Sequence, residues 1–386
     1  MRSAGLALTI VLFSISALCF GSSPKQLAEL TASDGAVGDD FGISVAVTGN
    51  TAVVGAAFAT IGSLQNVGAA YVFVKLGSGT WTQVAKLTPS NGVSYQYFGY
   101  SVAISGNTIV VGCGGIFGGA YVFVKPADDW RDMNETAILG GGSQVAMSGN
   151  TIATGVWVYV KPKTGWVSDM LPTATLSEKQ PQDDGFGASV AISGNTVVVG
   201  AIGQNYKLNG SAYVFVKPAS GWTNITQTAK LTQSDGTSLD NFGFSVSVSG
   251  ATIAVGARDK NSGLPYAGAA YVYVEPSGGW TDATETAELT NAAGNRDSQF
   301  GFSVAATTGR IVVGSPYGYG PNNEGAAYVY NQPKSGWVTT SQYSAQLLPS
   351  DAQAGNSFGI SVAENGGFIL VGASELPVAP GAAYIF

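Results

Sequence analysis

Short stretches in which apolar residues alternate with small or polar ones recur along the whole chain. The clearest is FGISVAVTGNTAVVGA from Phe41, and close copies begin at Phe98, Phe186, Phe242, Phe300 and Phe358. A less regular seventh copy, GGSQVAMSGNTIATG, begins at Gly141. Alternation with a period of two predicts β-strands, and the Gly-Asn pair or its variant inside each copy predicts a tight hairpin. Each copy therefore predicts two short antiparallel strands.

Two further strand signals follow most copies of this hairpin. The third strand is predicted at Tyr71–Lys75, Tyr121–Lys125, Tyr213–Lys217 and Tyr271–Glu275, and the turn after it ends in Trp. The fourth strand is predicted at Ala85–Thr88 and Ala229–Thr232. Four short antiparallel strands in seven tandem units are typical of propeller blades. We therefore predict an all-β fold, a seven-bladed β-propeller.

The two ends of the chain predict how this ring closes. The segment Gly381–Phe386 reads as a third strand with no fourth strand after it, and Lys25–Thr31 reads as a fourth strand with no others before it. We expect the N-terminal strand to complete the last blade, because a closed ring leaves few free strand edges. We also expect the small residues of F-G-x-S-V-A to lie on the crowded inner side of each first strand.

The first 23 residues differ from the rest of the chain. Arg2 precedes an apolar run from Leu6 to Phe20, and small residues follow it, which is typical of a secretory signal peptide. An uncleaved anchor is the alternative. We predict a signal peptide over 1–23, a propeller over 24–386, and a secreted or cell-surface location with no membrane insertion after cleavage. Three sequons, at Asn134, Asn209 and Asn224, predict glycosylation if the host is a eukaryote.

The order of the repeated elements F-G, V-V-G-A and G-A-A-Y-V-F resembles the FG-GAP repeats of integrin α-chain propellers, over about residues 25–386. The resemblance implies a module for adhesion or interaction. In integrins, several first hairpins hold Ca²⁺ in an Asp-rich loop. Here the equivalent hairpins are as short as Thr48-Gly49-Asn50, and no D-x-D-x-D-G occurs. Because Ca²⁺ takes six to eight oxygen ligands, we expect neither calcium sites of this kind nor any other cofactor.

Acidic residues recur in the linkers between units. They are Asp34, Asp40, Asp184, Asp235, Asp240, Asp297 and Asp351. One interpretation is that they bind a cation or a basic ligand on one face. The other is turn chemistry, in which Asp side chains bond to nearby backbone, and the repetition favours this interpretation.

The loops between the second and third strands differ from blade to blade, so they are the better candidates for a ligand site. The candidate residues are Tyr206, Lys207, Arg258, Asp259, Tyr266, Tyr317, Tyr319, Asn322 and Glu324. Tyrosines beside amides and charges suit sugar or peptide recognition. Tyr95, Tyr97 and Tyr100 could extend the same face. An ordinary polar loop is the alternative interpretation.

The composition narrows the function further. The chain has no histidine, which excludes Ser-His-Asp and Cys-His catalysis and histidine metal sites. A net charge of −7, without a basic cluster, argues against nucleic acid. We therefore predict a monomeric, non-catalytic module that binds an extracellular glycan or protein. The alternatives are a lectin-like propeller with repeated sugar sites and a polysaccharide lyase or hydrolase using carboxylate pairs such as Asp39–Asp40 or Asp183–Asp184.

Overall fold

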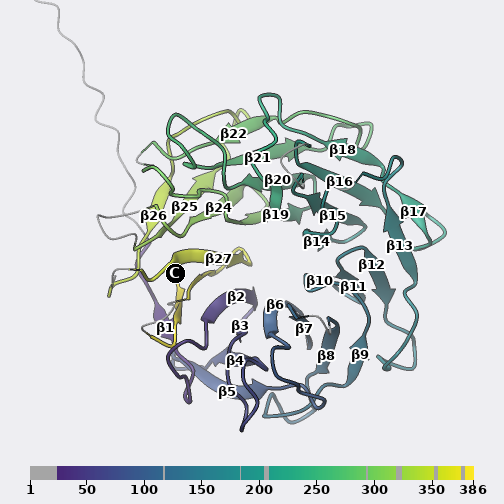
Figure 1. Ribbon diagram of the computed structural model, residues 1–386, viewed down its shortest axis with the longest axis vertical. Coiled ribbons are helices and arrows are strands. Elements are labelled where there is room, and N and C mark those ends of the chain that lie inside the picture. The colour runs from purple at the N-terminus through teal and green to yellow at the C-terminus, as the bar shows by residue number, and fades with distance from the viewer. Residues whose placement is uncertain are drawn as a thin grey trace, which may run out of the picture.

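A computed structural model describes residues 24–115, 118–182, 184–203, 208–292, 294–318, 324–351, 355–374 and 379–386. In these ranges the strands form seven sheets arranged as a ring around a central channel (Figure 1). The predicted seven-bladed, all-β propeller is confirmed. The predicted signal peptide lies outside the described residues. Within them, no helix has the length and apolar character that a membrane crossing requires.

Each blade holds four strands in the order that the sequence predicts. From blade 1 to blade 7, the innermost strands are β2 (Phe41–Thr48), β6 (Phe98–Ser105), β10 (Val145–Ser148), β14 (Ser189–Ser193), β19 (Phe242–Ser249), β23 (Ser303–Thr307) and β27 (Phe358–Glu364). The second strands are β3 (Thr51–Ala56), β7 (Thr108–Cys113), β11 (Thr151–Thr154), β15 (Thr196–Ala201), β20 (Thr252–Ala257), β24 (Arg310–Ser315) and β28 (Ile369–Ala373). The third strands are β4 (Ala69–Lys75), β8 (Ala120–Val124), β12 (Trp157–Val160), β16 (Ser211–Val216), β21 (Ala269–Val274), β25 (Ala326–Asn331) and β29 (Ala382–Ile385). The outer strands are β5 (Trp81–Leu87), β9 (Ala137–Leu139), β13 (Ala174–Ser177), β18 (Ala229–Leu231), β22 (Ala287–Leu289), β26 (Ala345–Leu347) and, in blade 7, β1 (Ala28–Leu30).

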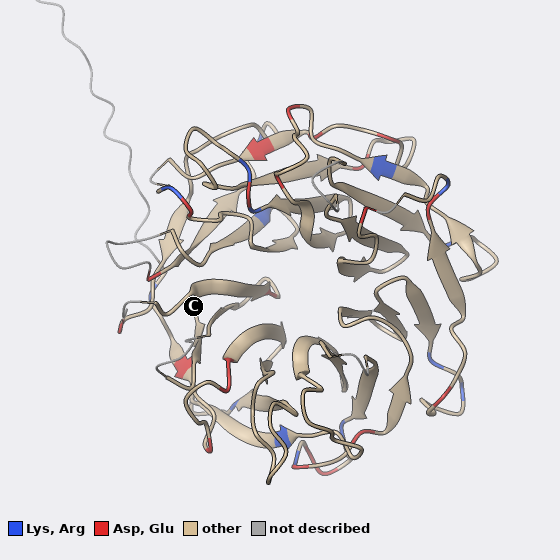
Figure 2. Cartoon of the chain, viewed as in Figure 1, with Lys and Arg blue, Asp and Glu red and all other residues tan. Residues whose placement is uncertain are grey.

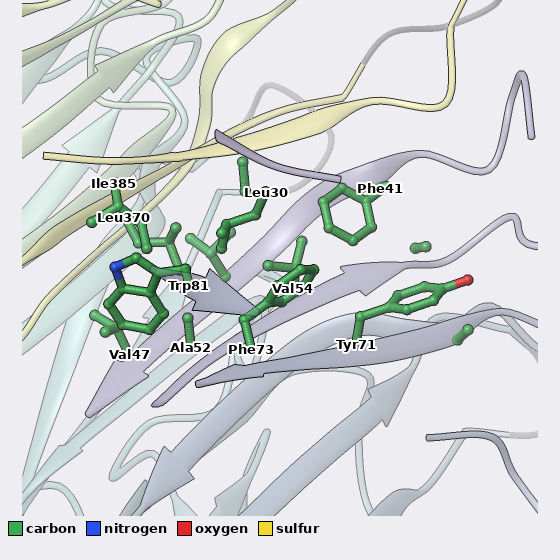
Figure 3. Packing of buried hydrophobic residues seen from close by; sticks show 14 of the residues in the cluster. Leu30, Phe41, Val47, Ala52, Val54, Tyr71, Phe73, Trp81, Leu370 and Ile385 are labelled. Carbon is green, nitrogen blue, oxygen red and sulfur yellow. The ribbon is translucent and has the colours of Figure 1, made fainter. Parts of the chain in front are cut away.

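The N-terminal strand closes the ring as predicted. Strand β1 pairs antiparallel with β29, and Leu30 lies opposite Ala383. Leu30 is 2% exposed and belongs to the apolar cluster between blades 7 and 1, with Leu370 and Ile385 on one side and Phe41 on the other (Figure 3). The Ser350 amide also donates to the Gln26 side chain over 2.9 Å. A segment of a few residues thus completes the sheet and the core of the seam.

The repeated F-G-x-S-V sequence forms the joint between neighbouring blades. The Ser44 hydroxyl donates to the Gly99 carbonyl of the next blade over 2.7 Å, and Ser361 donates to Gly42 across the seam over 2.7 Å. The same bond is made by Ser189, Ser245 and Ser303. A Cβ on Gly55, the glycine of V-V-G-A, would lie 2.0 Å from the Gly99 oxygen. Only glycine fits there, because this close approach leaves no room for a side chain.

The small residues of the first strands line the channel, and their serines also reach the neighbouring blade. Ser44 and Ser101 line the central cavity, and Ala46 and Ala103 line the channel further along. Valines line the channel as well, among them Val45, Val102 and Val190. The Ser44 hydroxyl bonds to the next blade because neighbouring blades approach each other closely at this point.

Aromatic residues fill the space between blades. In blade 1, the Phe41 ring contacts Tyr71 and Phe73 with centroid distances of 5.5 and 6.0 Å. Equivalent triplets occur in five other blades. The six tryptophans that end the turns are buried, as predicted for packing at the blade rim: Trp81, Trp130, Trp166, Trp222, Trp280 and Trp337. Cys113 is buried and unpaired.

The outer edges of the sheets are covered by the following blade, which the sequence did not predict. The Lys86 amide of β5 donates to the Asp132 side chain over 2.7 Å, and Lys230 of β18 donates likewise to Asp282. An additional short strand, β17 (Ile225–Thr226), pairs parallel with β13 of the preceding blade. These contacts occupy backbone groups that would otherwise be exposed along an edge.

Candidate binding surface

The linkers between blades and the loops between second and third strands share one end of the propeller, here called the top face. Charged residues lie mostly in the loops outside the innermost strands (Figure 2). Of the predicted site residues, Arg258, Asp259, Tyr266, Tyr317 and Glu324 are described. Tyr206, Lys207, Tyr319 and Asn322 lie outside the described residues.

Four of the acidic linker residues serve the fold. Asp34 accepts hydrogen bonds from the Tyr71 hydroxyl over 2.9 Å and from Lys86 over 2.5 Å. Asp235 is bonded in the same way by Tyr271 and Lys260. Tyrosines of the third strands also donate to Asp184 and Asp351. Since this contact recurs between blades, it explains these four acids by structure, and their partners are side chains in addition to the local backbone.

Burial also argues against an exposed ring of carboxylates. Asp40, Asp184 and Asp240 are each buried, and the neighbouring Asp39 is buried too. In the described ranges, no three His, Cys, Asp or Glu residues are grouped in a way that could hold a metal ion. Asp183, the partner of Asp184 in the second adjacent pair, is outside those ranges.

Asp40→Asn is expected to stabilise the protein at neutral pH. Burial, and then the neighbouring Asp39 carboxylate, raise the pKa of Asp40 from 3.8 to about 6. Ionisation is therefore penalised in the folded state, so this contribution lowers stability as pH rises from about 4 to about 6. The full penalty is at most about 3 kcal/mol above that range. Asn removes the charge and tolerates the left-handed φ of 57° at this position, which Asn241 occupies in blade 5 with a φ of 52°.

Urea unfolding of both proteins across this pH range measures the effect. The free energy gained by the variant should be about 1–3 kcal/mol near pH 7.5 and close to zero near pH 3.5. Asp34→Asn is the control, because a hydrogen bond from Lys86 helps to lower the pKa of Asp34, so its loss should not stabilise the protein at neutral pH. A gain for Asp40→Asn that does not vary with pH would contradict the assignment.

Three of the predicted site residues converge on one hollow between blades 5 and 6. Asp259, Tyr266 and Tyr317 line it together with Asp297 and Gln299, around a volume of about 520 Å³. Tyr266 and Tyr317 are 47% and 36% exposed. The sequence placed Asp297 only among the repeated linker acids and missed Gln299. Glu324 does not line this hollow, and its carbonyl accepts from Phe358 at the joint between blades 6 and 7.

The backbone fixes the shape of this hollow. The amides of Asp297 and Gln299 in the linker donate to the carbonyls of Pro265 and Tyr266 in the blade 5 loop, both over 3.0 Å. Tyr266, Asp297 and Gln299 have left-handed φ values of 53°, 62° and 50°. Residues other than glycine persist in this region only where surrounding contacts hold them. The linker and the blade 5 loop therefore form one framework that presents four of the five side chains, and Tyr317 comes from the loop of blade 6.

Arg258 lies beside the hollow but is committed to other contacts. Its guanidinium carbon is 3.8 Å from the Phe244 ring centroid and 5.3 Å from that of Phe302. Its Nε is 3.6 Å from the Asp259 carboxylate, and although this contact lowers the pKa of Asp259, burial outweighs it and raises the pKa. Because its guanidinium stacks on these rings and contacts Asp259, Arg258 is not a free charge available to a ligand in the hollow.

Phe244 and Phe302 lie between the hollow and the mouth of the central channel. They occupy the variable position of F-G-x-S-V, and with Tyr100 they line a central cavity of about 380 Å³. Their rings are 5.0 Å apart, and Phe302 contacts Tyr317 with a centroid distance of 6.3 Å. The sequence carried a usable signal, because F-G-F occurs only in these two copies.

The joint between blades 1 and 2 repeats this framework with other side chains. The backbone amides of Tyr95 and Tyr97 donate hydrogen bonds to the carbonyls of Gln65 and Asn66 over 2.9 and 3.1 Å. Both tyrosines have left-handed φ values. Tyr97 contacts the Phe58 and Tyr95 rings, with centroid distances of 5.0 and 6.4 Å. Tyr95 and Tyr100 are 52% and 42% exposed. These tyrosines thus form an aromatic surface on the top face.

Comparison with known proteins agrees with the architecture. A family model described as the FG-GAP repeat matches residues 24–73, 81–123, 180–215, 225–273, 283–330 and 342–386, more than half of the chain. The unmatched stretch 124–179 contains most of blade 3, whose copy of the repeat lacks F-G. No curated protein matches the chain. Fold and family indicate a module of the binding or adhesion type, and the chain belongs to the FG-GAP repeat family.

Proposed function

We propose that this protein is a secreted, non-catalytic binding module that holds a glycan in the hollow between blades 5 and 6. The observation that carries the proposal is the convergence of Tyr266 and Tyr317 with Asp297 and Gln299 in one hollow. Tyrosine rings offer flat apolar faces for sugar rings, and carboxylate and amide groups bond to hydroxyls. Secretion rests on the predicted signal peptide.

A single glycan site fits these loops better than a set of repeated ones. The hollow depends on a combination of residues that the joint of blades 1 and 2 does not share, since Asn66 and Tyr95 stand there in place of Tyr266 and Asp297. A protein ligand is the second candidate. Exposed apolar side chains on the same face, among them Leu64, Val93 and Leu239, favour it.

A glycan and polysaccharide array with the purified propeller tests this proposal. Tyr317→Ala and Tyr266→Asn should each weaken binding about tenfold, because each removes one aromatic face. Tyr266→Asn keeps the left-handed backbone favourable, as Asn66 does at the equivalent position. Val338→Ala is the control, since Val338 is 48% exposed and follows the Trp337 turn, away from the top face.

The outcomes separate the candidates. Glycan binding that both tyrosine substitutions weaken, and that Val338→Ala leaves unchanged, supports the proposal. Absence of binding to any glycan on the array, or binding that neither tyrosine substitution alters, overturns it. If no glycan binds, a protein captured by the wild type but not by Tyr317→Ala would support the second candidate.

A further inference from the structure

Exposed tyrosines of the described residues gather on one face. They are Tyr95, Tyr100, Tyr266 and Tyr317. Two of them line the hollow, and the other two belong to blade 2 and its linker, across the central channel (Figure 1). Most other described tyrosines are buried between blades. Exposure of large aromatic rings on one face only is typical of a surface that contacts a ligand.

Aromatic contacts run from the hollow to the channel mouth, and the opposite joint begins at Tyr100, which lines the same cavity. Tyr317 contacts Phe302, Phe302 contacts Phe244, and both phenylalanines share the lining of the channel mouth with Tyr100. The Tyr100 amide in turn donates to the Tyr97 carbonyl over 3.2 Å, and Tyr97 contacts Tyr95. We call the six residues Tyr266, Tyr317, Phe302, Phe244, Tyr100 and Tyr95 the aromatic track.

The charges beside the aromatic track argue against an anionic ligand. Arg258 stacks on Phe244 and contacts Asp259, so these two charges offset each other, while Asp297 adds a carboxylate to the hollow that can accept hydrogen bonds from sugar hydroxyls. At the far end, the Tyr95 hydroxyl donates to the Gln65 amide oxygen over 3.0 Å, which places a neutral polar group beside the ring. Aromatic faces interspersed with hydroxyl, amide and carboxylate groups match a polymer of sugar units better than they match a charged peptide.

We propose that the aromatic track binds an extended neutral glycan chain, with one end in the hollow and later sugar units over Phe302, the channel mouth and the Tyr95 joint. This inference rests on the proposed function and adds the ligand's length and course. A chain that is already held at one end reaches the remaining rings at high effective concentration, so its affinity exceeds that of a single unit.

Isothermal titration with gluco-, manno- and xylo-oligosaccharides, from the monosaccharide to the hexasaccharide, tests this inference. For the series that binds, the hexasaccharide should bind at least about tenfold more tightly than the disaccharide. Tyr100→Ala and Tyr95→Asn should together remove most of that difference and leave disaccharide affinity unchanged. Both variants should fold, because Ala188 occupies the Tyr100 position in blade 4 and Asn tolerates the left-handed φ of 65° at Tyr95.

Tyr317→Ala provides the contrast, since it should weaken the disaccharide and the hexasaccharide alike. Disaccharide and hexasaccharide binding of equal strength would overturn the aromatic track but leave the hollow as a glycan site. A length dependence that persists in the Tyr100→Ala and Tyr95→Asn pair would overturn the aromatic track in the same way. Failure of every series to bind would overturn both the proposed function and this inference.

Discussion

Removal of residues 24–31 is expected to lower the free energy of unfolding by about 5 kcal/mol, because the deletion opens the ring at its seam. The loss includes the buried Leu30 side chain, the backbone pairing between β1 and β29, and the Gln26 contact to Ser350. It also exposes the outer edge of β29. Comparing proteins that begin at Pro24 and at Ala32 by thermal unfolding should show a melting temperature about 10 °C lower for the shorter one.

Two point substitutions show which part of this loss comes from the core. Leu30→Ala should cost about 2–4 kcal/mol, because Leu30 is packed between blades, while Glu29→Ala should change stability little, because Glu29 is exposed on the same strand. A synthetic peptide covering 24–31 should restore part of the melting temperature of the shortened protein. Equal melting curves for the two chain lengths would disprove closure by β1.

Gly256→Ala is expected to destabilise the joint between blades 5 and 6 by about 3 kcal/mol. An added Cβ would lie 2.0 Å from the Gly301 carbonyl oxygen and 2.3 Å from the Ser245 hydroxyl. Neither neighbour can move alone, because Ser245 donates to that same carbonyl over 2.9 Å. The methyl group must therefore separate the two blades and weaken the bond that joins them. Chemical unfolding of the variant and the wild type measures the loss.

Gly278→Ala is the matched control for the joint. A Cβ on Gly278 would meet nothing within 4 Å, and its backbone does not require a left-handed φ. Its effect should stay within about 0.5 kcal/mol, and loss of freedom in the unfolded chain favours a small gain. Ser245→Ala should cost about 1 kcal/mol, since it removes the hydrogen bond without adding bulk. If both glycine substitutions had the same effect, the steric explanation of V-V-G-A would be wrong.

The fold could be predicted from the sequence because a repeat reveals its own boundaries. Alternation within SVAVT and TAVVGA gave the strands, and the incomplete first and last units gave the closure. The sequence could not predict which residues of the neighbouring blade each face of a strand contacts. Alternation shows that Ser44 and Val45 point in opposite directions, but only the ring geometry decides that Ser44 reaches Gly99. The same limit hid Asp132, which bonds to the preceding blade.

The candidate site was predicted only in part. Variation between loops identified Asp259, Tyr266 and Tyr317, because residues that depart from a repeat are free to serve a ligand. It missed Gln299, which lies in a linker where the repeat itself explains the neighbouring positions. It also counted Arg258 among the candidate ligand-binding residues, although its guanidinium stacks on Phe244 and it does not line the hollow. Phe244 lies on β19 and Arg258 directly follows its hairpin partner β20, so the hairpin places them near each other, but alternation alone does not show that the Arg258 side chain stacks on the ring.

The last blade is built from three strands of the C-terminal end and one strand of the N-terminal end, and this arrangement affects how such a chain can evolve. Both ends belong to the same blade, whereas every internal unit runs from one innermost strand to the next. Duplication or loss of a whole internal unit in the gene would leave the two ends still able to meet. The number of blades can then change while β1 still closes the ring, provided that the Ser–Gly joints tolerate a different angle between neighbouring blades. Blade 3, which keeps its place in the ring although its copy lacks F-G, shows how far one unit can diverge inside this frame.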